Sequence, residues 1–139
     1  MKDLSLVKPV LVQVFLTFAV LFLMAKERYG AVQRREVRQD DPGIRPVWTG
    51  KAGAVSNAYH NLLEQPVLFY AAVAFAMLSG ANDWEMLALA WAYVVCRFVQ
   101  AGIHVTYNKT THRFFAFLAG TIVLIAMWVN IALYVLLGW

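Results

Sequence analysis

Four long apolar stretches constrain this chain more than any other feature. They run over about residues 7–25, 54–78, 84–107 and 114–138, and each approaches or exceeds the roughly 20 residues that an α-helix needs to cross a bilayer. A spanning segment must satisfy its own backbone hydrogen bonds, and we see no period-two alternation of the kind that a closed barrel needs. The sequence therefore predicts an all-α fold, an integral membrane four-helix bundle that forms a single domain over residues 1–139.

The composition supports a membrane environment and argues against two other classes of protein. Apolar residues make up 61% of the chain and charged residues 14%, against about 25% charged residues in an ordinary soluble domain. So small a soluble protein lacks the interior to bury this much apolar surface. The net charge of +4 does not indicate nucleic-acid binding, because the basic residues cluster between the hydrophobic segments.

The connections between the stretches predict an orientation in the membrane. The first connection, residues 26–53, is long and carries seven Lys or Arg residues, and the third, residues 108–113, is short and also basic. The second connection, residues 79–83, has an acidic residue, Asp83, as its only charged residue. By the positive-inside rule we expect the first and third connections to be cytoplasmic and both termini to lie on the far side.

Polar residues interrupt the apolar pattern of the second and third stretches, and in each stretch their spacing places them on one helical face. They are Asn57, His60, Asn61 and Glu64 in the second stretch, and Tyr93, Arg97, Gln100, His104 and Tyr107 in the third. The two stretches are expected to be antiparallel, which puts Glu64 and Arg97 at a similar depth, ~15 Å from the cytoplasmic side. Because an unpaired charge at mid-bilayer is costly, we predict that these two side chains form an ion pair.

Two interpretations of these polar faces remain open. The pair of Glu64 and Arg97 can be structural and fix the register of the helices. Alternatively, the remaining polar residues line a ligand cavity beside it. A metal site is not predicted, because His60 and Glu64 at a spacing of four are not accompanied by any zinc-type signature.

Several motifs together resemble the MAPEG family, the membrane-associated proteins of eicosanoid and glutathione metabolism. The resemblance is carried by the four spans with a long basic first connection, the arginine-rich run from Arg34 to Arg38, Asn61-Leu62-Leu63-Glu64 followed by Pro66, Arg97 with Gln100 and His104, and Arg113 at the start of the fourth span. The sequence looks closest to a bacterial branch of the family, which implies a bacterial inner membrane location.

The resemblance implies a glutathione site shared between the subunits of a homotrimer. Arg113 resembles the catalytic arginine that enzymatic members place near the glutathione thiol. The expected glutathione-binding residues are Arg34, Arg38, His60, Asn61, Glu64, Arg97, Gln100 and His104. The chain departs from the enzymatic members at Asn57 and His60, where they carry arginines.

The sequence therefore leaves more than one function open. One is a glutathione-dependent transferase or peroxidase of the microsomal type, acting on a lipophilic small molecule that arrives from the bilayer. The alternative is a non-catalytic membrane protein that binds a lipid or a partner protein through the same cavity. A small channel or transporter is a third interpretation, since a polar stripe can line a path through a membrane.

Overall fold

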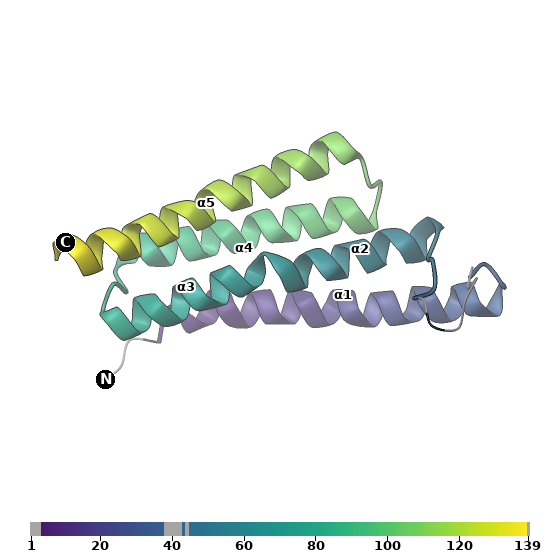
Figure 1. The fold of residues 1–139 in the computed structure, drawn as a ribbon, viewed down its shortest axis with the longest axis horizontal. Helices are drawn as coiled ribbons and strands as arrows, with labels where there is room; N and C mark the ends of the chain where they lie inside the picture. Colours follow the sequence, from purple (N-terminus) through teal and green to yellow (C-terminus); the bar gives the residue numbers. More distant parts are fainter. Residues whose placement is uncertain (1–3, 38–42, 44, 139) are drawn as a thin grey trace.

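The computed structural model describes residues 4–37, 43 and 45–138, and every regular element in them is an α-helix. The helices are α1 (Val7–Gln33), α2 (Gly50–Glu64), α3 (Pro66–Ser79), α4 (Trp84–Val105) and α5 (Thr110–Leu137). The second span consists of α2 and α3, which follow one another in nearly the same direction (Figure 1). Four segments are long and apolar enough to cross a membrane, as the sequence predicts.

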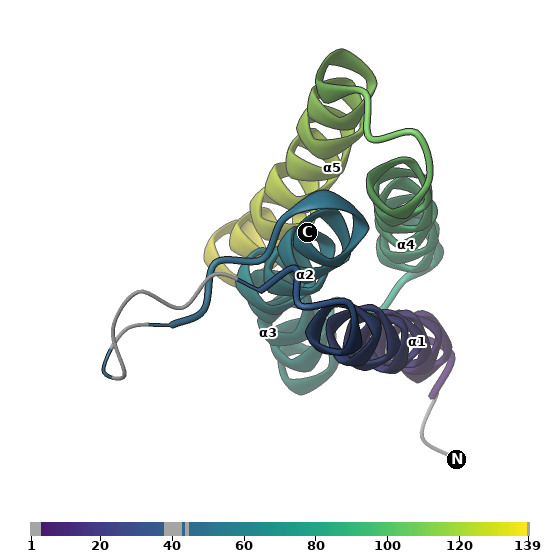
Figure 2. The same cartoon turned by 90° about the vertical axis from the view of Figure 1, so that its right-hand side faces the viewer.

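The helices form an up-and-down bundle with its two basic connections at one end. The described ends of the chain and the connection from α3 to α4 lie at the opposite end (Figure 1). Seen from the basic end, α4 lies beside α5, and α1 lies beside α2 (Figure 2). This arrangement is the one that short connections between antiparallel helices favour.

The helix ends explain where the spans begin and stop. Pro66 occupies the first position of α3. A backbone N–H at this position has no acceptor within the helix, so the missing N–H group of proline costs no helical hydrogen bond. Gly80 ends α3 in the left-handed region at φ 86°, which only glycine adopts without strain. Asp83 then caps α4, because its side chain accepts a hydrogen bond of 2.9 Å from the backbone N–H of Met86.

Helix α1 is longer than the apolar pattern predicts. It continues past residue 25 to Gln33 and has 27 residues, or about 40 Å of helix. The first connection is correspondingly shorter than expected, and α2 begins at Gly50. Helix α5 begins at Thr110, so Arg113 lies in the first turn of a helix and not at the edge of a loop.

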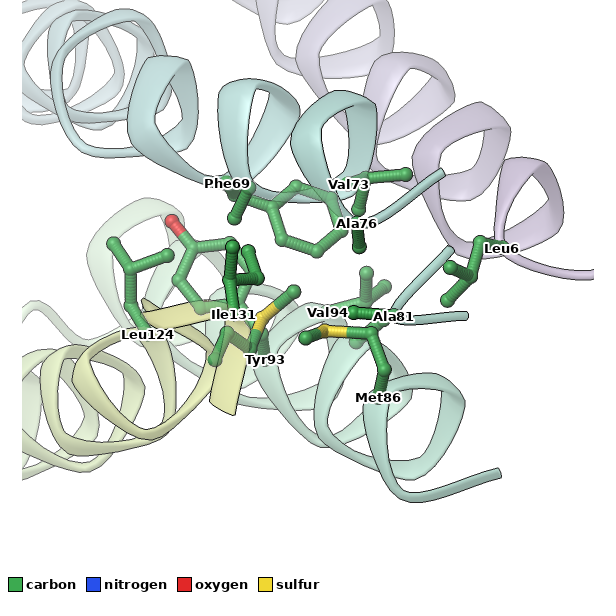
Figure 3. Packing of buried hydrophobic residues seen from close by; sticks show 13 residues of the cluster. Leu6, Phe69, Val73, Ala76, Ala81, Met86, Tyr93, Val94, Leu124 and Ile131 are labelled. Atoms are coloured by element: carbon green, nitrogen blue, oxygen red, sulfur yellow. The ribbon is translucent and has the colours of Figure 1, made fainter. Parts of the chain in front are cut away.

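The apolar core has two clusters, one between α1, α2 and α4 that includes Val20 and Leu62, and a larger one toward the end of the bundle that carries the described chain ends. There Phe69 stacks on Tyr93, with ring centroids 4.6 Å apart, and both side chains are fully buried (Figure 3). Leu6, Met86 and Ile131 close the same cluster. In the most apolar window of each span, only 22% to 39% of the residues are buried within the chain. Most of the outward apolar surface must therefore contact lipid or other chains.

Candidate functional site

A buried arginine organises the middle of the bundle. Arg97 in α4 is 1% exposed. Its Nη1 donates hydrogen bonds to Gln65 Oε1 at 3.1 Å and to Gln100 Oε1, and its Nη2 donates to the backbone oxygen of Asn61 at 2.9 Å. Three oxygen acceptors from two spans thus replace part of the water that the guanidinium loses on burial, and its Nε has no partner within the described residues.

The predicted ion pair between Glu64 and Arg97 is wrong for this chain. Glu64 is exposed, and the ion pairs among the described residues do not include it. The helix break provides the physical reason, because α2 ends at Glu64 and the next side chain, Gln65, turns toward α4. The neutral amide of Gln65 therefore lies beside Arg97, where the expected depth had placed the carboxylate of Glu64.

Gln65 also links the arginine to α5. Its Nε2 donates to Thr121 Oγ1 at 2.7 Å, and Thr121 Oγ1 in turn donates to the backbone oxygen of Phe117 at 2.9 Å. The helical spacing of the polar faces did not indicate Gln65 or Thr121. The available signal was the position of Gln65 directly before Pro66, where a helix interruption redirects a side chain.

Arg113 is held by two acceptors near the basic end of the bundle. Its Nη1 donates to Asn108 Oδ1 at 2.8 Å and contacts His104 Nε2 at 3.1 Å. Since a guanidinium can only donate, the Nε2 of His104 must accept, and the imidazole therefore carries its proton on Nδ1. Both hydrogens of Nη1 are used, and the three N–H groups on Nη2 and Nε have no partner within the described residues.

A polar pocket of about 170 Å³ lies beside Arg113. Asn61, Gln100 and Arg113, three of the predicted site residues, line it together with residues of the first two turns of α5. Gln100 connects the pocket to the buried Arg97 network, because its Oε1 accepts from that arginine. The chain therefore brings together one cluster of predicted residues: Asn61, Arg97, Gln100, His104 and Arg113.

The other predicted site residues do not join this cluster within one chain. His60 is exposed and lines a different cavity, between α1 and α2. Arg34 is exposed and forms an ion pair with Glu36 at 3.0 Å; the hydrogen bond and the charge of Glu36 raise the pKa of its guanidinium. Arg38 lies outside the described residues. Within the described part of the chain, no three His, Cys, Asp or Glu side chains cluster as a metal site requires.

An apolar groove of about 350 Å³ runs along α3 and α5 next to the network. Gln65 and Thr121 form one end of its lining, and Leu124, Ile125 and Trp128 are among the residues that continue it along α5. Thr121 follows Phe117 of the polar pocket by one helical turn, or about 5.4 Å. The polar pocket and the apolar groove are thus neighbours, with the network of Arg97 and Gln65 between them.

These features define an integral membrane protein with four helical spans and a polar site built around a buried arginine. The chain matches the MAPEG family over residues 6–133, which is nearly its whole length. It belongs to the MAPEG family, and the resemblance seen in its motifs is confirmed. Comparisons with curated proteins and with solved structures gave no match.

Proposed function

We propose that this protein is a glutathione-dependent transferase or peroxidase that acts on a lipophilic substrate. The observation that supports this most directly is the adjacency of a polar pocket at Arg113 and an apolar groove at Gln65, one helical turn apart on α5. A peptide thiol suits the polar pocket, and a lipophilic molecule can enter the groove from the bilayer. Many MAPEG members depend on glutathione, which agrees with this assignment.

Arg113 is the residue to which we assign the catalytic role. A free thiol has a pKa near 8.5 and is mostly protonated at neutral pH, so a nearby guanidinium favours the thiolate, which is the nucleophile. In conjugation, the thiolate sulfur forms a bond to an electrophilic carbon, the leaving group departs, and the thiol proton has already passed to solvent. Two acceptors hold Arg113 in place, and three of its N–H groups remain for the ligand.

The remaining residues fit the binding of a peptide with carboxylates and an amine. Asn61 and Gln100 line the pocket and offer amide groups, and the planar guanidinium of Arg113 suits a carboxylate as well as a thiolate. Ligand pockets usually measure about 300–1,000 Å³, so the 170 Å³ pocket of one chain accommodates only part of such a ligand.

We therefore propose that a neighbouring subunit completes the site in a homotrimer. The exposed His60, Glu64 and Arg34 would then contribute from outward faces of the chain. Arg38, which the family resemblance also implies, lies outside the described residues. Native mass spectrometry in mild detergent tests this assembly, and a trimer is the expected species. A purely monomeric protein that still turns over glutathione would contradict the shared site.

The decisive experiment measures both binding and turnover. Isothermal titration with glutathione in detergent is expected to give a Kd in or below the millimolar range, and Arg113→Gln is expected to weaken it at least tenfold. Turnover is assayed with 1-chloro-2,4-dinitrobenzene for conjugation and with cumene hydroperoxide for reduction. Lys26→Gln, an exposed charge change on α1, is the control and should behave like the wild type. Absence of binding at millimolar glutathione would contradict the proposal.

A non-catalytic binding function is the second candidate, and one observation favours it. Arg113 already donates to His104 and Asn108, so part of its hydrogen-bonding capacity is used within the chain. A protein that binds a lipid or a partner through the same pocket would need no activated thiol. Glutathione binding without turnover on either substrate would support this candidate over the enzyme.

A further inference from the structure

A second polar cavity lies at the basic end of the bundle, away from Arg97 and Arg113. It measures about 500 Å³ and opens between the last turns of α1, the connection that follows, and the first turns of α2. Its lining consists of Arg28, Arg45, Pro46, Trp48, Gly53, Ser56, Asn57 and His60. This volume falls in the usual range of small-molecule sites.

Arg28 is held in this cavity by two independent contacts. Its Nε donates a hydrogen bond of 2.9 Å to Ser56 Oγ, and Ser56 is only 4% exposed. The guanidinium carbon also lies 4.9 Å from the ring centroid of Trp48, in a cation–π contact. Because Nε is used, the four N–H groups on Nη1 and Nη2 stay available on the side of the guanidinium that a bidentate anion binds.

The position of Trp48 itself depends on a close backbone approach. A Cβ atom on Gly53 would lie 2.6 Å from the backbone oxygen of Trp48, which is too close for any side chain. Only glycine at this position lets the segment before α2 pack tightly enough to set the indole under Arg28. The cavity is therefore a built feature of the chain and not a gap between loosely placed side chains.

The charge balance of the cavity is positive. Arg28 and Arg45 both line it, and no Asp or Glu among the described residues belongs to its lining. Two carboxylates of the described part of α1 and its end pair with other cations, since Glu27 pairs with Lys51 at 3.6 Å and Glu36 pairs with Arg34. Within residues 4–37, 43 and 45–138, no carboxylate forms an ion pair with Arg28 or Arg45.

The depth of the cavity suits a phosphate at the membrane surface. Arg28 lies about 32 Å along the axis of α1 from Val7, and the hydrocarbon core of a bilayer is about 30 Å thick. The guanidinium is therefore expected at the level of the lipid headgroups. His60 and Asn57, which are exposed at the cavity, add further hydrogen-bond donors beside the two arginines.

We propose that this cavity binds a phosphate group, with Arg28 as its fixed bidentate donor and Arg45 as a second cation at the rim. The phosphate can belong to the headgroup of an anionic phospholipid or to a soluble phosphorylated molecule, and the recognition chemistry is the same for both. Within one chain this cavity is separate from the pocket at Arg113. The two proposals share only His60, and the phosphate donors Arg28 and Arg45 have no part in the proposed glutathione site.

The test compares two probes on the full chain in a non-ionic detergent. Retention of phosphatidylglycerol is measured by native mass spectrometry, and binding of glycerol 3-phosphate is measured by isothermal titration. Arg28→Gln and Arg45→Gln are each expected to reduce binding of the recognised probe at least fivefold. Arg35→Gln, which removes an exposed arginine outside the cavity lining and outside the proposed glutathione site, is the matched control and should leave binding unchanged.

Each outcome bears on the proposal. Loss confined to phosphatidylglycerol supports a lipid headgroup, and loss confined to glycerol 3-phosphate supports a soluble ligand. Equal loss in Arg35→Gln would mean that the basic surface attracts anions without a site, which overturns the proposal. Absence of binding by both probes would overturn it as well. Since Arg45 is exposed and makes no contact that α1 or α2 needs, Arg45→Gln keeps the test valid even if Arg28→Gln folds poorly.

Discussion

Arg97 Nη1 in α4 donates a hydrogen bond of 3.1 Å to Oε1 of Gln65, the residue at which the second span passes from α2 to α3. The amide group of Gln65 also donates to Thr121 in α5 at 2.7 Å. One side chain thereby links the second, third and fourth spans around a buried positive charge. The interruption of the helix at Gln65 is what makes this side chain available to the interior.

Gln65→Leu is expected to destabilise the bundle, and Glu64→Gln is its matched control. The first change leaves Arg97 with one acceptor fewer, so the free energy of unfolding should fall by about 1–3 kcal/mol. The second change alters an exposed side chain and should stay within about 0.5 kcal/mol. Equilibrium unfolding in detergent measures both, and similar losses in the two variants would argue against the central role of Gln65.

The four spans could be predicted, because the length of an apolar stretch alone indicates a membrane-spanning helix. The residues at which these helices end could not be predicted. Helix α1 continues through Lys26 and Arg28 to Gln33, since this polar stretch contains no proline and its one glycine, Gly30, costs only about 1 kcal/mol in a helix. The helix stops before Arg35, which adopts a left-handed conformation at φ 56°. Hydropathy marks where the hydrocarbon ends and carries no information on how far a helix extends into the headgroup region.

The sequence predicted which helix faces carry the candidate site and how deep it lies in the membrane. It did not predict which side chains contact one another. Asn61, Arg97 and Gln100 could be grouped because helical spacing and antiparallel order place them near one another, whereas Arg113 was added by the family resemblance. The contact of Arg97 with Gln65 could not be predicted, because the rotation of side chains around the break at Gln65 is not encoded in a regular period. Asn108, which accepts a hydrogen bond from Arg113, lies in a connection, where helical periodicity makes no prediction.

Gly53→Ala is expected to disturb the cavity at Arg28. The new Cβ would meet the Trp48 backbone oxygen at 2.6 Å, so the segment before α2 must shift, at a cost of about 1–3 kcal/mol. Gly30→Ala is the control, because its Cβ would meet only the flexible side chain of Arg34. Thermal unfolding in detergent, combined with the phosphate-probe titrations, should separate the two variants. A loss in Gly30→Ala as large as that in Gly53→Ala would remove the explanation.

Gln13→Met is expected to stabilise the bundle. Gln13 in α1 is fully buried, and neither polar atom of its amide group has a hydrogen-bond partner within the described chain. Burial of an unsatisfied polar group costs about 1–3 kcal/mol, and methionine has a similar shape without that cost. A higher midpoint of unfolding is therefore expected. A lower midpoint would mean that the amide group has a role that packing alone does not explain.

Cysteine labelling should report opposite membrane sides for Thr49 and Asn82. Thr49 precedes α2 at the basic end, and Asn82 lies in the turn between α3 and α4 at the other end. With Cys96→Ala as background, an impermeant maleimide applied to intact bacterial cells should label Asn82→Cys and should label Thr49→Cys only after lysis. This pattern follows from the positive-inside rule for the basic connections. Labelling of both positions in intact cells would contradict the four-span topology.

The two acceptors of Arg113 provide the last prediction, which rests on the function proposed for the polar pocket. His104→Leu and Asn108→Ala each remove one acceptor of Nη1 and leave the guanidinium less well oriented toward the pocket. Each lost hydrogen bond should weaken glutathione binding by up to about tenfold, which corresponds to about 1.4 kcal/mol. Tyr107→Phe is the matched control, because it removes a neighbouring hydrogen bond to His112 that does not involve Arg113. Titration with glutathione measures all three variants. If Tyr107→Phe weakens binding as much as the other two, the effect comes from the connection as a whole and not from the orientation of Arg113.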